Sequence, residues 1–371
     1  MNFDFSDENK LLREQARRFL ADRCPTSAVR RILEGDETHD RALWQGMAEM
    51  GWLGAAVPEA YGGAGLGAEG LCVLAEEIGR AIAPVPFASS VCLATEALLR
   101  HGSEAQRQQW LPPMVAGASI GCFALAEGAG NPRQAAVRAQ VRAGRLHGEK
   151  WPVIDGNMAD FAIVVALGDD DQPGLYRVSL TGEGVERAPL RGIDPSRDQA
   201  RVRFDGAPAE ALTGGAAGWP AVEALLDRAA ALLAFEQVGG ADACLAMATA
   251  YAKERHAFGR PIGSFQAIKH KLADVYIATE LARSNAYYGA WALAHDAPEL
   301  ALAAATARVA ATEAFHVAAK ENIQTHGGMG FTWEMDCHLF YRRARLLAVQ
   351  LGSAPHWKNR LVTLWSGQAA A

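Results

Sequence analysis

The spacing of apolar residues changes twice along this chain, and this change limits the folds that it can adopt. From residue 1 to about 118 the spacing is helical, as at Leu12 and Ala16. From about 119 to 213 apolar and polar residues alternate, and from 220 to 371 helical spacing returns in an alanine-rich stretch. The pattern predicts an α+β protein with an N-terminal helical domain (1–118), a central antiparallel β domain (119–213) and a C-terminal four-helix bundle (220–371).

Individual segments within these three zones show the pattern of one helix or one strand. Helices are expected around residues 12–23, 42–50, 71–82, 91–99, 220–254, 265–294, 298–326 and 335–351. Strands are expected at 137–142, 145–147, 161–167 and 201–204. The Gly- and Ala-rich stretch at 213–220 predicts a flexible linker before the last zone.

Composition excludes several classes of protein. The net charge of −6 argues against a nucleic-acid-binding protein, and no apolar run approaches the ~20 residues that span a bilayer. The segment MNFDFSDENK carries acids where a signal peptide carries basic residues. The scattered cysteines are typical of reduced thiols, so a cytoplasmic location is expected; they are Cys24, Cys72, Cys92, Cys122, Cys244 and Cys337.

Three segments carry the most specific sequence patterns. They read WQGMAEMGWLGAAVPEAYGGAG (44–65), ERHAFGRPIGSFQAIKHKLADV (254–275) and IQTHGGMGFTWEMDCHLFYRRAR (323–345). The last two match the patterns R-x-x-F-G-[RK]-x-[IL]-x-x-x-Q and Q-x-x-G-G-x-G-[FY], and the first leads into a P-E-x-Y-G-G loop. In their order and spacing they resemble the signature segments of the acyl-CoA dehydrogenase family, and the resemblance covers nearly the whole chain.

This resemblance implies a bound FAD and names the residues that would hold it. They are Arg255, Phe258, Gln266, Gln324, Gly327 and Gly328. Their chemistry suits the cofactor, because a guanidinium fork binds phosphate oxygens, a phenyl ring offers an apolar face, and paired glycines let backbone approach a ligand. In the family the cofactor lies largely against a neighbouring subunit, which implies a homo- or hetero-oligomer, either a dimer or a tetramer. Read singly, Gly327 and Gly328 could be a helix stop and Arg255 a surface ion-pair partner.

The central zone departs from the family pattern. A stretch like T-E-P-G-A-G-S-D should contact the flavin ring, but here it reads LAEGAGNP (125–132), with Leu125 and Ala126 at the start. The following K-x-W-I-T-N-G pattern reads KWPVIDG (150–156), which puts Pro152 in place of the tryptophan and Ile154 in place of the threonine. Trp151 comes one position early, so it compensates only if the strand register shifts.

The catalytic base is not identified by the resemblance. The reaction needs a carboxylate to remove the α-proton of a thioester. The usual glutamate position aligns with Leu351, and the alternative position, on the first helix of the last domain, aligns with Ala229. Two nearby acids are candidates. Asp227 could also be a surface charge, and Glu236, which lies on an apolar helix face, could also be a buried glutamate tied to a backbone group or an arginine.

Two functions therefore stay open. The first is FAD-dependent α,β-dehydrogenation of an acyl-CoA thioester, with electrons passing to an acceptor flavoprotein. The second is a cofactor-sharing subunit that supplies the adenine side of the FAD site to a partner that supplies the base, as in heteromeric members acting on bulky thioesters. A flavin oxidase is a further alternative. No histidine pair has metal-ligand spacing, and His326 is expected to line the nucleotide site or to pack.

Overall fold

The computed structural model describes residues 5–215 and 217–369. The contacts divide the chain into two compact units. We call Met1–Val29, Cys72–Ala83 and Ala230–Ala371 the helical unit, and Arg30–Leu71 with Pro84–Ala229 the sheet unit. The α+β prediction with helical ends and a central sheet is confirmed. The domain boundaries at 118, 213 and 220 stay a prediction, because parts of the N-terminal region group with the C-terminal helices.

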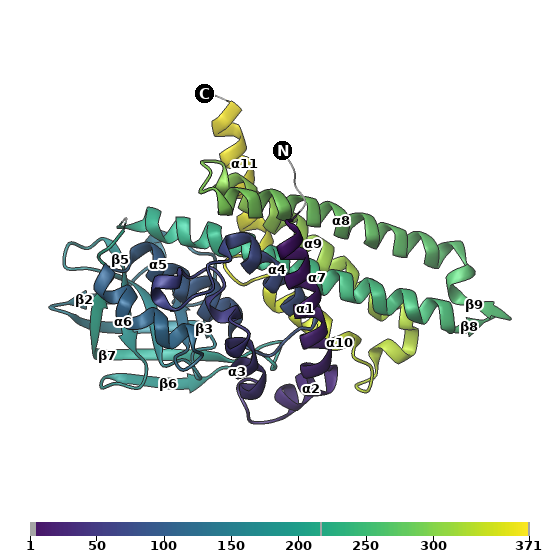
Figure 1. The fold of residues 1–371 in the computed structure, drawn as a ribbon, viewed down its shortest axis with the longest axis horizontal. Coiled ribbons are helices and arrows are strands. Elements are labelled where there is room, and N and C mark those ends of the chain that lie inside the picture. The colour runs from purple at the N-terminus through teal and green to yellow at the C-terminus, as the bar shows by residue number, and fades with distance from the viewer. Residues whose placement is uncertain (1–4, 216, 370–371) are drawn as a thin grey trace. The chain divides into compact units, whose positions relative to one another are not determined.

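Long helices make up the helical unit (Figure 1). They are α1 (Asp7–Arg23), the second half of α4 (Gly67–Arg80), α7 (Trp219–Glu254) from Ala230 onward, α8 (Gln266–Ala294), α9 (Leu300–His326), α10 (Cys337–Leu347) and α11 (Ala354–Ala369). Three predicted helices match α7, α8 and α9 to within two residues. The helix expected at 335–351 ends four residues early, and a separate helix, α11, follows it.

Shorter helices and all of the large sheet belong to the sheet unit. The helices are most of α2 (Thr26–Glu34), α3 (Arg41–Glu49), the π-helix η3 (Phe87–Thr95), α5 (Glu96–His101) and α6 (Glu104–Val115). Helix α6 begins with a capping box in which Ser103 and Gln106 satisfy each other's amides, and it continues through Pro112 and Pro113. The start of α6 is therefore fixed locally, although prolines lie inside it.

Seven strands pair in one mixed sheet in the order β1-β4-β2-β3-β7-β5, with β6 beside β7 and a further pairing of β4 with β5. They are β1 (Gly121–Ala124), β2 (Gln140–Arg142), β3 (Arg145–Ile154), β4 (Phe161–Leu167), β5 (Pro173–Ser179), β6 (Val185–Pro189) and β7 (Gln199–Ala211). The prediction of an antiparallel sheet is wrong for β4, which pairs in parallel with β1 and β2. Alternation in sequence shows which side chains are buried, and it carries no information on strand direction.

Helices α4 and α7 touch backbone to backbone within the helical unit. A Cβ placed on Gly79 would lie 1.9 Å from the carbonyl oxygen of Glu236, and a Cβ on Gly239 would lie 1.8 Å from that of Glu76. No side chain fits at either point, so two glycines on facing helices set how closely the helices approach.

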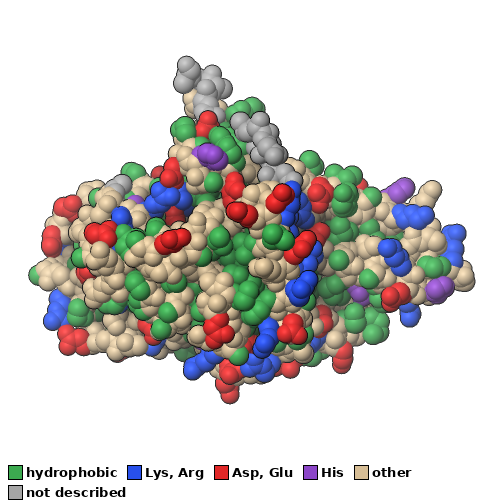
Figure 2. Space-filling view, in the orientation of Figure 1, with side chains coloured by type: hydrophobic (Ala, Val, Ile, Leu, Met, Phe, Trp, Pro, Cys, Tyr) green, Lys and Arg blue, Asp and Glu red, His purple; other side chains and the backbone are tan. Residues whose placement is uncertain are grey.

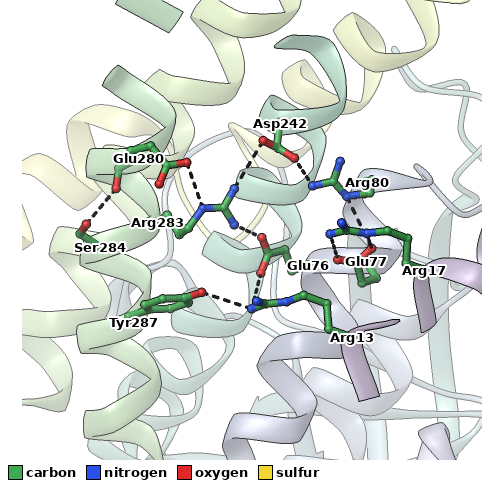
Figure 3. A network of polar contacts seen from close by, with 10 residues as sticks. All are labelled: Arg13, Arg17, Glu76, Glu77, Arg80, Asp242, Glu280, Arg283, Ser284 and Tyr287. Atoms are coloured by element: carbon green, nitrogen blue, oxygen red, sulfur yellow. Dashed lines mark hydrogen bonds and ion pairs between the residues drawn. The ribbon is translucent and has the colours of Figure 1, made fainter. Parts of the chain in front are cut away.

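A network of arginines and acids links α1, α4, α7 and α8 (Figure 3). Glu76 and Glu77 are each only 1% exposed. Glu76 accepts hydrogen bonds from Arg13, at 3.3 Å, and from Arg283, and Glu77 accepts one from Arg17 at 2.7 Å. Because two buried carboxylates would be costly alone, these guanidinium partners are what permits their burial. Arg80, Asp242, Glu280, Ser284 and Tyr287 complete the network.

One helix in the described part of the chain, α7, has the length and hydropathy of a membrane span. Of its most apolar 18-residue window, 78% is buried inside the structure. That burial is typical of the core helix of a globular protein, which passes the same test of length and composition.

Candidate cofactor site

The first signature segment leaves α7 and turns back into α8 through a small hairpin. The amide of Arg255 donates to the carbonyl of Tyr251 at 2.8 Å, and this is the last turn of the helix. The carbonyl of Arg255 accepts from the amide of Ile262, also at 2.8 Å. Strands β8 (His256–Ala257) and β9 (Arg260–Pro261) pair between these points. Phe258 and Gly259 form the tip, both with positive φ (53° and 79°). The turn thus presents the segment at one end of the helical unit.

The side chains of this segment project away from the rest of the unit. Phe258 is 96% exposed and lies edge-to-face with Phe265, at 6.2 Å between ring centroids, while Arg260 lies 4.1 Å over the ring of Phe265. Among the described residues, the side chain of Arg255 forms no hydrogen bond or ion pair, and Gln266 is exposed at the first position of α8. A fully exposed phenylalanine on left-handed backbone is typical of a surface that binds something else.

The second signature segment follows the end of α9. Gly327 has a φ of 59° and donates its amide to the carbonyl of Gln324. A Cβ added to Gly327 or Gly328 would meet nothing within 4 Å, so open space surrounds this backbone. The turn η6 (Gly327–Phe331) then exposes Met329 by 50% and Phe331 by 82%.

The helix ends that lead into the two signature segments are joined at one end of the helical unit. The rings of Tyr251 and His326 stack with their centroids 4.1 Å apart. Lys271 on α8 pairs with Glu321 on α9 at 3.3 Å, and the Asn322 amide lies 3.8 Å from the sulfur of Met247. Figure 2 shows Lys, Arg and His side chains gathered at the end where Figure 1 places β8 and β9. His326, expected to line the site or to pack, is 5% exposed and packs.

In the sheet unit, the stretch that should face the flavin ring is tied to β3. The amide of Trp151 donates to Ala126 at 2.8 Å, and the amide of Gly128 donates to Trp151 at 2.9 Å. The buried ammonium of Lys150 lies 2.6 Å from a Glu127 carboxylate oxygen, and it donates to the Leu125 carbonyl at 3.2 Å. Burial lowers the pKa of Lys150, and the Glu127 carboxylate opposes that shift. Leu125 and Ala126 therefore lie in a loop that is held to β3 by backbone hydrogen bonds and by one ion pair.

Trp151 lies at a bulge in β3. Lys150 pairs with Val202 and Val153 pairs with Ala200, so β3 has one residue more than β7 between these points. The Trp151 ring packs near Gly128 and under the Arg201 guanidinium, which is 4.6 Å from its centroid. The tryptophan is thus placed beside the Gly-Ala-Gly loop, while no side-chain hydroxyl is available at Pro152 or Ile154.

The two candidate bases are buried among charges. Glu236 pairs with Arg343 at 3.5 Å, with side chains 4% and 1% exposed. Burial lowers the pKa of nearby Arg308 to about 10, against the attraction of Glu236. Asp227 is 4% exposed, so the expectation of a surface charge there is wrong. The adjacent Arg228 pairs with Glu96.

Leu351, at the usual base position, lies in an apolar contact. It packs against a buried cluster made of Ala230, Ala231, Ala304, Ala305 and Trp357. Its φ of 64° is a left-handed conformation that leucine adopts rarely. The preceding turn is fixed by Arg308, which donates to the carbonyls of Leu347 and, at 2.8 Å, Gln350. Sequence patterns missed Arg308, since its partners lie far along the chain.

Comparisons with known proteins identify the family. Residues 6–118 match the family model described as acyl-CoA dehydrogenase, N-terminal domain, and residues 216–355 match acyl-CoA dehydrogenase, C-terminal domain. The chain belongs to the acyl-CoA dehydrogenase family. It is 35% identical to the acyl-CoA dehydrogenase IpdE2 of Mycobacterium tuberculosis over 96% of each chain. The comparisons confirm the predicted family, the predicted fold and the predicted enzyme class, an oxidoreductase acting on CH–CH bonds.

Two solved structures in this family are similar over nearly the full length. One is a variant of the Tcur3481–Tcur3483 steroid acyl-CoA dehydrogenase, 33% identical with a TM-score of 0.89, covering 98% of this chain and 99% of that one. The other is the ChsE4–ChsE5 complex from Mycobacterium tuberculosis, 28% identical with a TM-score of 0.90, covering 99% of both. Both are assemblies of two different proteins.

Proposed function

We propose that this protein takes part in the FAD-dependent α,β-dehydrogenation of an acyl-CoA thioester. The observation that carries the proposal is the stack of Tyr251 on His326, which joins the end of α7, just before the first signature segment, to the second signature segment at the end of α9. Members of the family bind FAD, and the C-terminal signature segments of this chain lie at the ends of α7, α8 and α9. The location is proposed to be the cytoplasm, in agreement with six buried thiols.

The residues at this end fit the dinucleotide part of FAD. Arg255 offers a guanidinium with no partner among the described residues, and Phe258 offers an exposed ring. Gln266 and Gln324 are exposed amides, and Gly327 has open space beside its backbone. A pyrophosphate needs cationic donors and backbone amides, and an adenine needs an apolar face.

The chemistry divides between the cofactor and the protein. Bound FAD would accept the hydride from the β-carbon while a base takes the α-proton of the thioester. This chain's own contribution is to bind and orient: Arg255 and Gln266 would hold the phosphates, and the Gly327 backbone would border the dinucleotide. The backbone of Leu125 and Ala126 would flank the ring, without the side-chain hydroxyl that the family pattern supplies.

A second function is favoured by the environment of the base positions. Leu351 packs in an apolar cluster and Glu236 balances a buried arginine, so neither provides an available carboxylate. Asp227 and Glu236 stay predictions as catalytic residues. A cofactor-sharing subunit of a hetero-oligomer, whose partner supplies the ring pocket and the base, agrees with these features. The substrate class proposed for either function includes bulky acyl-CoA thioesters, since one similar structure is named a steroid acyl-CoA dehydrogenase.

One preparation separates the two functions. The chain is purified alone, its flavin absorbance is measured, and short, long and steroid acyl-CoA thioesters are added without oxygen. Flavin that is bound and bleached supports a dehydrogenase that acts by itself and passes electrons to an acceptor flavoprotein. A colourless protein that becomes yellow and active only with a paralogous chain supports the cofactor-sharing subunit, and peroxide formed in air would indicate an oxidase.

The proposed residues are tested in whichever oligomer binds FAD. Arg255→Ala should lower FAD content at least about tenfold, because a charge-assisted phosphate contact is lost. Arg18→Ala is the matched control, since Arg18 is an exposed arginine of the same unit. Equal flavin content in both variants would overturn the assignment of Arg255.

A further inference from the structure

One pair of aromatic rings joins the two halves of the candidate cofactor site. Tyr251 lies in the last turn of α7, and His326 is the last residue of α9. Their ring centroids are 4.1 Å apart, with 29° between the ring planes. The Tyr251 carbonyl accepts the Arg255 amide at 2.8 Å, and Gly327 follows His326 directly. The stacked pair is therefore adjacent to the point where each half leaves its helix.

The stack is a fixed contact. His326 is 5% exposed, and its Nδ1 lies 2.8 Å from the carbonyl oxygen of Asn322, to which it donates. That hydrogen bond sets the ring orientation from within α9. The ring is thus held on one side by its own helix and on one face by Tyr251.

The other side-chain links at this end are weaker. The ion pair between Lys271 and Glu321 has a lysine that is 46% exposed, and solvent screens such a pair. The contact between Asn322 and the Met247 sulfur, at 3.8 Å, is a weak hydrogen bond. An aromatic pair stabilises a structure by more than the burial of its two ring faces alone. The stack of Tyr251 on His326 is therefore the strongest of these three links.

We infer that Tyr251 and His326 are positioning residues for the dinucleotide end of the cofactor site. They act through Arg255 and Gly327, whose separation they fix before the cofactor arrives. A site with its halves already placed loses less conformational freedom on binding than one whose halves move independently. This inference rests on the proposed function, because it assigns a role toward the same cofactor.

The test compares a variant that removes the ring with one that keeps it. Tyr251→Leu should weaken FAD binding about twofold to tenfold, the range expected for loss of one aromatic pair, and Tyr251→Phe should bind FAD like the parent protein. Affinity is measured by titrating FAD into the cofactor-depleted oligomer. ADP is titrated as a second probe, because it carries the adenosine and pyrophosphate without the flavin ring. An equal fold-loss for ADP and FAD places the effect at the dinucleotide end.

A double substitution tests whether the two rings act as one unit. Tyr251→Leu combined with His326→Leu should weaken FAD binding no more than either change alone. If the two rings acted independently, their fold-losses in affinity would multiply. His326→Phe keeps a ring and should bind FAD within about twofold of the parent. The thermal midpoint of the cofactor-depleted protein is recorded for every variant, so that a general loss of stability is recognised.

The outcomes separate this inference from the proposed function. If Arg255→Ala loses FAD while Tyr251→Leu binds FAD and ADP normally, the positioning role is wrong and the cofactor site stands. If Arg255→Ala and Tyr251→Leu both bind normally, the cofactor site itself is wrong. A Tyr251→Phe loss as large as that of Tyr251→Leu, or a lower midpoint with unchanged affinity, would also overturn the positioning role.

Discussion

The carboxylate of Glu236 lies 3.5 Å from the guanidinium of Arg343, and both side chains are almost fully buried in the helical unit. Arg343 also donates to the carbonyls of Ile82 (3.1 Å) and Ala83 (3.4 Å). Arg343 thus ties α10 to the residues that follow α4, and the acid balances its buried positive charge. We therefore expect Glu236 to matter for folding stability more than for proton transfer.

Glu236→Gln tests that expectation. The change leaves Arg343 and Arg308 buried without their counter-charge, so the free energy of unfolding should fall by about 3–5 kcal/mol. Turnover per bound flavin in the protein that remains folded should be unchanged. Urea unfolding and single-turnover flavin reduction measure the two effects, with the exposed Glu14→Gln as control. A turnover loss above about a hundredfold with an unchanged urea midpoint would instead make Glu236 the base.

Leu351→Glu asks whether the usual base position faces a substrate. Because Leu351 packs on the cluster that contains Ala230 and Trp357, a carboxylate there should cost about 2 kcal/mol or more and should create no dehydrogenase activity in the chain alone. Val349→Glu is the control, since Val349 is 60% exposed and should tolerate the charge. Thermal unfolding and acyl-CoA-dependent flavin bleaching are the measurements. Activity gained without loss of stability would contradict the packing of Leu351.

Gly79→Ala and Gly239→Ala probe the close approach of α4 and α7. Each new Cβ would overlap a backbone atom less than 2 Å away, so the helices have to separate, at a cost of at least about 3 kcal/mol. Gly367→Ala is the matched control, because Gly367 lies in α11 with nothing near its Cβ position and should gain about 0.5–1 kcal/mol of helix propensity. Urea midpoints compare the three variants. Normal stability in Gly79→Ala would show that the helices lie further apart.

His39 should make the stability of the sheet unit fall in mild acid. Burial lowers the pKa of His39 below its ordinary value of 6.5, against the attraction of Asp155. Below pH 6.5 the unfolded chain takes up a proton at this histidine, while the folded chain does not. The folded state is therefore most stable above pH 6.5, and it loses this stability as the pH falls toward the lowered pKa of His39. His39→Asn should therefore reduce the drop in urea midpoint between about pH 7.5 and about pH 5.5. His147→Asn, at a half-exposed histidine, should leave the drop as it is.

Sequence periodicity located α7, α8 and α9 well because each buries an extended surface, and it did not predict α11. The helix predicted at 335–351 was predicted to end too late. Helix α10 ends where the Arg308 side chain donates hydrogen bonds to the carbonyls of Leu347 and Gln350. An arginine on another helix provides that stop, and no local pattern reveals it. The surface position expected for Asp227 failed for a related reason: α7 is apolar on nearly every side, so its sequence defines no exposed face.

Motif spacing predicted which residues form the candidate cofactor site, but not what holds them together. Arg255 and Gly327 stand in segments whose patterns are visible along the chain. The stack of Tyr251 on His326 depends on the packing of α7 against α9, which the sequence does not specify. The bulge beside Trp151 is similar, since it becomes visible only when β3 is paired with β7.

The arginine–acid network also constrains the order in which this molecule can mature. Arg13 donates to the Tyr287 hydroxyl, a residue 274 positions further along the chain. At roughly 5–20 residues per second, a ribosome needs roughly 15–55 s to make that stretch, so α1 emerges long before its partner on α8 exists. Removing the first helix would take away two of the guanidinium groups that pair with the buried carboxylates of Glu76 and Glu77. The contacts of α1 are therefore complete only after α8 has been made.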